Sequence, residues 1–255
     1  MTESTTSYPL VPIANTQLRE IRSSIIGQEY QVKVRLPEEY ASTTTLYPVL
    51  YLLDGDHAFA MATDIVQYLI YGNHIPDLII VSTAYDSKKH PDEGGKNMRN
   101  RDLVPYPIPE IDMTPGGVQY LEFIQQELIP FVESNYRVLT NDRTLWGYSL
   151  GGLFALYALF QKPDLFQRYI IVDGFDEKYF EMEKDYASQH TDLPIRLFLS
   201  ASPVTLGREL SEFFAALNNR KYPTFRAEYA PLNEMGHFAV GAEGLTKGLV
   251  SVFGK

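Results

Sequence analysis

The 255-residue sequence contains no cysteine and no apolar run approaching the roughly 20 residues that span a bilayer. The absence of cysteine excludes disulfides, thiolate metal sites and a cysteine nucleophile. Basic residues are also scarce: 22 Lys and Arg stand against 32 Asp and Glu, which gives a formal net charge of −10. Because nucleic acids and anionic membrane surfaces attract clusters of Lys and Arg, we expect neither of them as a partner.

The amino-terminal segment also lacks a targeting pattern. Residues 1–15 do not show a basic stretch followed by an apolar core, which is the pattern of a secretory signal peptide, so we expect a cytoplasmic protein. Residues 1–14 are rich in Ser, Thr and Pro and are predicted to form a loose tail. Residues 15–255 show no break in composition and no internal repeat, and they are predicted to form one domain.

Short apolar runs alternate with helical patterns over most of the chain. The runs are typical of strands buried on both faces and cover residues 47–56, 77–85, 143–149, 168–174, 195–201 and 224–230. The helical patterns cover residues 57–71, 114–136, 150–161, 207–219 and 242–253. Strands that alternate with helices of this length indicate βαβ units and a mostly parallel sheet, with helices on both faces.

Two segments of the chain depart from this pattern. Residues 17–26 and 29–36 alternate between apolar and polar side chains, which predicts a half-buried antiparallel hairpin. Residues 86–113 fit neither a strand nor a helix and are predicted to form a long loop. This loop leaves the carboxyl end of a predicted strand, the sheet edge where ligand sites gather in α/β proteins.

The sequence Gly147-Tyr148-Ser149-Leu150-Gly151 matches the pattern G-x-S-x-G. A buried strand leads into it and an apolar helix leads out of it, as a nucleophile elbow requires. A sharp turn of this kind lifts a serine hydroxyl above the sheet. We therefore expect Ser149 to be a nucleophile.

A serine hydroxyl needs a base, and His237 is in the expected place, after the last predicted strand and before the final helix. The other histidines are predicted to be ordinary surface or core residues: His57, His74, His90 and His190. None of them has a second ligand at metal-like spacing, and H-E-x-x-H does not occur, so no metal or cofactor is expected.

Acyl transfer also needs donors for the oxyanion of the tetrahedral intermediate. The backbone N–H of Leu150, directly after the nucleophile, is the first expected donor. The second is expected in the loop after the strand in residues 49–53, and the N–H of Asp56 is the best candidate there.

At this point the chain resembles a known family. The segments YPVLYLLDGD, GGKNMRNRDL, LEFIQQELIPFVESNYRV, GYSLGG and GHFAVGAEGLTKGL look like the putative-esterase family of α/β hydrolases. That family includes siderophore, feruloyl and acetyl-xylan esterases, esterase D and the mycolyltransferases. The resemblance implies a single-domain α/β-hydrolase fold, a small-molecule ester as substrate, and catalysis by Ser149 and His237. It also implies that Arg99, Arg101 and Asp102 line the entrance of the site.

A triad also needs a carboxylate that orients the histidine. Many members of the family carry Glu or Asp after the strand that corresponds to residues 195–201, but this chain has Thr205 there. Asp173, at the end of the preceding strand, is our preferred candidate, although it could be an ordinary turn residue. Glu209 is an alternative that could equally lie on a solvated helix face. A Ser–His dyad without an acid is the third possibility.

The leading hypothesis for function is a carboxylic ester hydrolase with an acyl-enzyme on Ser149. An acyltransferase would use the same intermediate, so the sequence does not separate the two activities. A catalytically inactive binding module is the alternative outside catalysis. Tyr148, Arg99 and Arg101 are the residues that we expect to contact the substrate, with the two arginines suited to an anionic one.

Overall fold

The computed structural model describes residues 11–85, 94–109, 111, 113–232 and 236–254. Within these residues eight strands form one sheet in the order β1-β2-β4-β3-β5-β6-β7-β8. The strands are β1 (Thr16–Arg22), β2 (Glu29–Arg35), β3 (Tyr47–Leu52), β4 (Ile79–Ala84), β5 (Val138–Tyr148), β6 (Arg168–Val172), β7 (Arg196–Ala201) and β8 (Arg226–Pro231). From β4 to β8 neighbouring strands are parallel.

The antiparallel hairpin expected at the start of the sheet is confirmed. β1 pairs with β2, and β2 pairs in turn with β4, both in antiparallel register. In β2 the side chains of Tyr30, Val32 and Val34 are fully buried, while residues between them are partly exposed. Residues 11–14 lie outside the sheet and are exposed, and residues 1–10 of the predicted tail lie outside the described residues.

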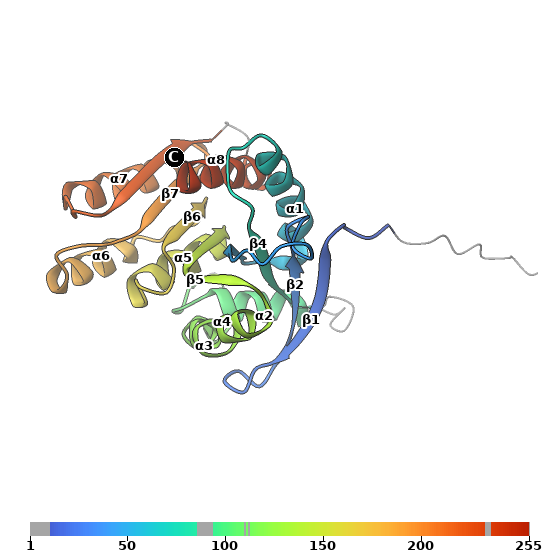
Figure 1. Ribbon diagram of the computed structural model, residues 1–255. Helices are drawn as coiled ribbons and strands as arrows, with labels where there is room; N and C mark the ends of the chain where they lie inside the picture. Colours follow the sequence, from blue (N-terminus) through green and yellow to red (C-terminus); the bar gives the residue numbers. More distant parts are fainter. Residues whose placement is uncertain (1–10, 86–93, 110, 112, 233–235, 255) are drawn as a thin grey trace, which may run out of the picture.

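Helices cover both faces of the sheet, as expected (Figure 1). They are α1 (Gly55–Tyr71), α2 (Gly94–Leu103), α3 (Gly117–Phe123), α4 (Ile129–Asn135), α5 (Leu150–Gln161), α6 (Lys178–Gln189), α7 (Gly207–Asn219) and α8 (Gly241–Phe253). α1 and α8 pack on one face, against Leu50, Trp146 and Phe198 of three strands. The other helices contribute to a larger core on the opposite face.

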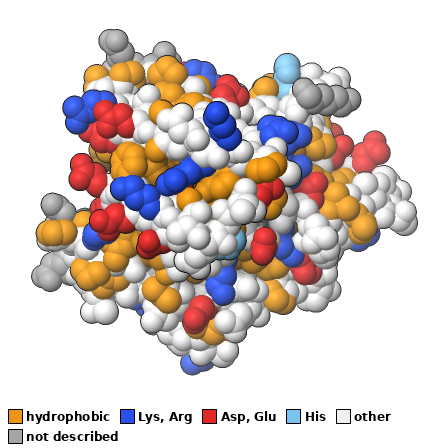
Figure 2. All heavy atoms as spheres, turned by 90° about the vertical axis from the view of Figure 1, so that its left-hand side faces the viewer, with side chains coloured by type: hydrophobic (Ala, Val, Ile, Leu, Met, Phe, Trp, Pro, Cys, Tyr) orange, Lys and Arg blue, Asp and Glu red, His pale blue; other side chains and the backbone are white. Residues whose placement is uncertain are grey.

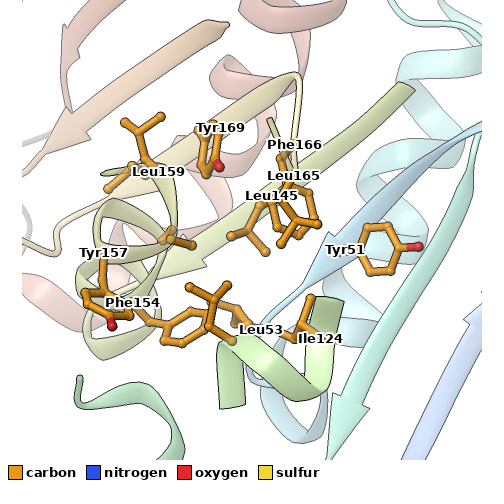
Figure 3. Packing of buried hydrophobic residues seen from close by; sticks show 14 of the residues in the cluster. Tyr51, Leu53, Ile124, Leu145, Phe154, Tyr157, Leu159, Leu165, Phe166 and Tyr169 are labelled. Carbon is orange, nitrogen blue, oxygen red and sulfur yellow. The ribbon is translucent and has the colours of Figure 1, made fainter. Parts of the chain in front are cut away.

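Large apolar side chains fill that second core. In Figure 3, Phe154 of α5 points toward Leu53, which follows β3, and toward Ile124, the first residue of the π-helical segment before α4. Burial of an apolar side chain of this size contributes about 1.5–3 kcal/mol. This packing fixes α5 on the sheet, and α5 begins directly after Ser149.

Two helices were not expected from the sequence. Residues 94–103 were predicted to lie in a long loop, but they form α2, a helix without an apolar stripe. α6 was also missed, because Glu183 occupies one of its buried positions between Tyr179 and Tyr186. Glu183 is paired with Arg220 at 2.7 Å, and this ion pair compensates the burial of its carboxylate. In both helices, tertiary contacts replace the apolar periodicity that sequence reasoning relies on.

The helix predicted over residues 114–136 is interrupted. It consists of α3, a π-helical segment (Ile124–Leu128) and α4. None of the helices in the described ranges is long and apolar enough to cross a membrane. On the face shown in Figure 2, acidic and basic side chains are interspersed with apolar ones.

Candidate active site

Ser149 lies in a sharp turn between β5 and α5, with φ 60° and ψ −123°. This left-handed backbone is unfavourable for a residue with a side chain, and such strain is typical of a nucleophile elbow. The turn is tight: a Cβ on Gly147 would overlap the carbonyl oxygen of Gly151. The N–H of Ser149 donates to the carbonyl of Val172 at 3.0 Å and so ties the turn to β6.

His237 begins a short 3₁₀ helix (His237–Ala239) between β8 and α8. Its Nε2 lies 2.9 Å from Oγ of Ser149, within hydrogen-bond distance. Its side chain is 30% exposed, so the ring lines a site that solvent can reach. The structure therefore brings together two residues that are 88 positions apart in the sequence.

Tyr148 contacts the histidine rather than standing free in a pocket. Its ring stacks on that of His237 with centroids 5.0 Å apart, and its hydroxyl donates to the backbone carbonyl of His237. Burial, followed by the negative charge of Asp173, raises the pKa of Tyr148 to about 12. Tyr148 thus remains a neutral donor at ordinary pH and holds His237 by both its backbone and its ring. Its contact with a substrate stays a prediction.

Asp173 follows β6 directly, and its carboxylate lies against the other ring nitrogen of the histidine. Oδ2 of Asp173 is 2.5 Å from Nδ1 of His237, and the Asp173 side chain is 0% exposed. The residue adopts φ 50°, a left-handed backbone that aims the side chain toward β7 and the histidine loop. Glu209, the other carboxylate that the sequence offered, lies in the first turn of α7 and pairs with Arg208 at 3.5 Å.

Thr205 is the residue that sequence reasoning missed. Its hydroxyl donates to Oδ1 of Asp173 at 2.5 Å, and the backbone N–H of Ser202 approaches the same oxygen at 3.3 Å. The one signal in the sequence was its position, since Thr205 stands where the resemblance to the esterase family led us to expect an acid.

The two expected oxyanion donors lie in the first turns of two helices, and each helix follows one of two neighbouring strands. Leu150 is the first residue of α5, after β5, and Asp56 is the second residue of α1, after β3. β3 and β5 pair side by side, and N–H groups in a first helical turn have no acceptor within their own helix. The carboxylate of Asp56 is engaged elsewhere, by the N–H of Tyr85 at 2.8 Å. The oxyanion role of both N–H groups stays a prediction.

Arg99 forms a two-pronged ion pair with Asp54 beside the elbow. Its Nε donates to Oδ1 of Asp54 and its Nη2 to Oδ2 at 2.9 Å. A Cβ on Gly151 would lie 3.3 Å from that Oδ2, which places the ion pair against the turn at Ser149. Burial lowers the pKa of Arg99, but the hydrogen bond and charge of Asp54 outweigh it and raise the pKa overall. Arg99 thus holds the turn before α1, and its contact with a substrate remains a prediction.

Arg101 points to a different partner. Its Nε donates to Oδ1 of Asp102 at 2.7 Å, and the hydroxyl of Tyr30 donates to Oδ2 of Asp102 at 2.7 Å. Asp102 is 0% exposed and does not line an entrance, contrary to what the resemblance implied. Burial raises the pKa of Asp102, opposed by the hydrogen bond from Arg101. The bond from Tyr30 to Asp102 connects β2 to α2, while contact of Arg101 with a substrate stays a prediction.

Metal ligands do not gather in the part of the chain that the structure describes. No group of three or more His, Cys, Asp or Glu side chains among those residues could hold a metal ion.

Comparison with known proteins gives the family. A family model described as Putative esterase matches residues 23–178, more than half of the chain. Ferri-bacillibactin esterase BesA of Bacillus subtilis is 27% identical over 258 residues, covering 89% of this chain and 86% of that protein. Siderophore triacetylfusarinine C esterase of Aspergillus fumigatus is 30% identical over 166 residues, covering 63% of this chain and 56% of that protein.

A solved structure agrees with these matches. An IroE-like serine hydrolase from Shewanella oneidensis superposes with a TM-score of 0.78 at 26% identity, over 93% of this chain and 80% of that one. Together with the mostly parallel sheet and its antiparallel hairpin, the family match leads to one conclusion. The chain belongs to the Putative esterase family of α/β hydrolases and is a carboxylic ester hydrolase.

Proposed function

We propose that the protein hydrolyses small-molecule carboxylic esters through an acyl-enzyme on Ser149. The observation that carries this proposal is the continuous chain of contacts from Ser149 Oγ to His237 Nε2, at 2.9 Å, and from His237 Nδ1 to Asp173 Oδ2, at 2.5 Å. His237 accepts the proton of the serine hydroxyl as the oxygen attacks the ester carbonyl. The same proton then passes to the alcohol that leaves.

The surrounding residues have distinct parts in this mechanism. The backbone N–H groups of Leu150 and Asp56 stabilise the oxyanion of the tetrahedral intermediate. Asp173 keeps a proton on Nδ1, so that Nε2 is the nitrogen free to accept, and it stabilises the imidazolium that forms. Water, activated by His237, then hydrolyses the acyl-enzyme and restores the serine hydroxyl.

We propose siderophore esters as the substrates, because one relative is named a ferri-bacillibactin esterase and another a siderophore esterase. An acyl acceptor other than water would use the same acyl-enzyme. Analysis of the products with and without added alcohols separates hydrolysis from acyl transfer.

Covalent labelling tests the nucleophile directly. A fluorophosphonate probe is expected to add one phosphonyl group to the wild-type protein, on Ser149, as measured by intact mass and peptide mapping. Ser134→Ala, in which an exposed serine of α4 is removed, is the matched control and should label like wild type. If the wild-type protein were not labelled, the chain would be an inactive scaffold; labelling of Ser149→Ala would place the nucleophile elsewhere.

The acid is tested by a pair of substitutions. Asp173→Asn should lower kcat by about 10²–10⁴-fold, because an amide does not hold the tautomer and charge of His237 as a carboxylate does. Glu209→Gln is the control and should stay near the wild-type rate, since Glu209 faces Arg208. Steady-state kinetics on an activated ester gives both values. The opposite ranking would assign the acid to Glu209, and two active variants would support a Ser–His dyad.

A further inference from the structure

The buried carboxylate of Asp173 has two donors that the mechanism above does not use. Both approach Oδ1, the oxygen that faces away from His237: the hydroxyl of Thr205 at 2.5 Å and the N–H of Ser202 at 3.3 Å. They come from the segment after β7, whereas Asp173 itself follows β6. The carboxylate is therefore held between two neighbouring strand ends.

The segment after β7 is folded so that these two donors converge. Thr205 N–H donates to the carbonyl of Ser202 at 3.1 Å, which closes a turn over residues 202–205. The N–H of Asp173 donates to the carbonyl of Ser200 at 2.8 Å, so the backbone of the acid is also tied to β7. The turn thus brings the Thr205 hydroxyl to a carboxylate that is fixed on the adjacent strand.

A carboxylate with no exposed surface needs hydrogen bonds, because an ionised group loses its hydration on burial. Bonds to a charged group are stronger than neutral ones, and a donor on one oxygen also fixes the rotation of the whole carboxylate. With Oδ1 held by Thr205, Oδ2 is left to face Nδ1 of His237. The orientation of the base therefore depends on a residue that touches neither the base nor the nucleophile in these contacts.

We propose that Thr205 is a positioning residue of this esterase: it holds Asp173 in the rotamer that orients His237. This rests on the proposed function of Ser149, His237 and Asp173. Thr205 takes no proton and forms no bond to the substrate; it acts only through Asp173. Thr205 lies after β7 and donates to a carboxylate that follows β6.

Three substitutions test this role, with kcat, KM and the pH dependence of kcat/KM as readouts. Thr205→Val keeps the shape of the side chain and removes the hydroxyl, and it should lower kcat by about 10- to 100-fold with little change in KM. Thr205→Ser restores a hydroxyl and should recover most of the rate. Val204→Ala, at the neighbouring position where the side chain is 63% exposed, is the control and should behave like wild type.

The pH profile separates positioning from a packing defect. Loss of the donor on Oδ1 alters the Asp173–His237 pair. The pH at which kcat/KM falls on the acid side should therefore differ between Thr205→Val and wild type. Thermal unfolding and circular dichroism check that the variant is folded, and Thr205→Ala serves in its place if it is not. A wild-type rate without the hydroxyl, a loss that serine does not repair, or a lower rate with an unchanged pH dependence would each overturn the proposal.

Failure of the proposed function would be recognised separately. If Ser149→Ala kept its activity, the catalytic assignment itself would be wrong, whatever Thr205 does. If Ser149→Ala is inactive and Thr205→Val is unaffected, only the positioning role of Thr205 is wrong.

Discussion

Ser149→Ala is expected to lower kcat for p-nitrophenyl acetate by about 10⁶-fold while the protein remains folded. The loss is this large because the hydroxyl is the group that forms the acyl-enzyme, and no other residue replaces a missing nucleophile. What remains should be the contribution of the oxyanion donors and of binding, about 10³–10⁴-fold over the reaction in water. KM should change little, since the rest of the site is untouched.

The structure also explains why the folded state should tolerate this substitution. Ser149 has φ 60°, and alanine carries the same Cβ, so the backbone strain is unchanged. The N–H bond to the carbonyl of Val172 involves only the backbone and is retained. Circular dichroism and thermal unfolding check the fold, and Ser134→Ala serves as the control. Near-normal turnover by folded Ser149→Ala would refute the proposed nucleophile.

His237→Gln is expected to have the second large effect, a loss of several orders of magnitude in kcat at every pH tested. Glutamine can still accept the hydrogen bond of the Tyr148 hydroxyl through its backbone carbonyl, so the loop should keep its place. Its amide does not accept a proton from Ser149. His190→Gln is the control, because His190 stacks on Tyr186 at the end of α6.

The wild-type enzyme should show the same requirement in its pH profile. A protonated imidazole has no lone pair for the serine proton, so kcat/KM should fall as the pH is lowered and reach a plateau at higher pH. The pH dependence of kcat/KM reports the ionisation of the free enzyme. A fast-reacting and a slow-reacting ester should therefore lose kcat/KM over the same range of acid pH when chemistry limits the rate. A flat profile from acid to alkaline pH, with chemistry shown to be limiting, would argue against His237 as the base.

The parts of the fold that were predicted depend on local patterns. β3 and β4 are buried on both faces, and the mostly apolar runs that contain them indicate this in the sequence. α5 and α7 begin and end at the residues that the helical patterns indicated. The elbow at Ser149 is also local, because its glycines are needed within two positions of the nucleophile.

The parts that were missed depend on contacts between distant residues. α2 has no apolar stripe, and its arginines bond to Asp54 after β3 and to its own buried Asp102. A search for apolar residues at helical spacing does not detect a helix that is held by such polar contacts. The burial of Asp102, which the resemblance placed at an entrance, likewise follows from its contact with Tyr30 on β2.

The sequence by itself predicted a mostly parallel α/β sheet and the strand–turn–helix around Ser149, since each has a signature within a few residues, and it predicted His237 from its place between the last strand and the final helix. Only the tertiary structure showed that Asp173, and not Glu209, lies against His237 and that Thr205 bonds to the acid. These residues lie after different strands, and their distances depend on which strands are neighbours in the sheet and on the turns that follow them. A φ of 50° at Asp173 and a turn closed at Thr205 decide that geometry, and neither leaves a pattern in the sequence.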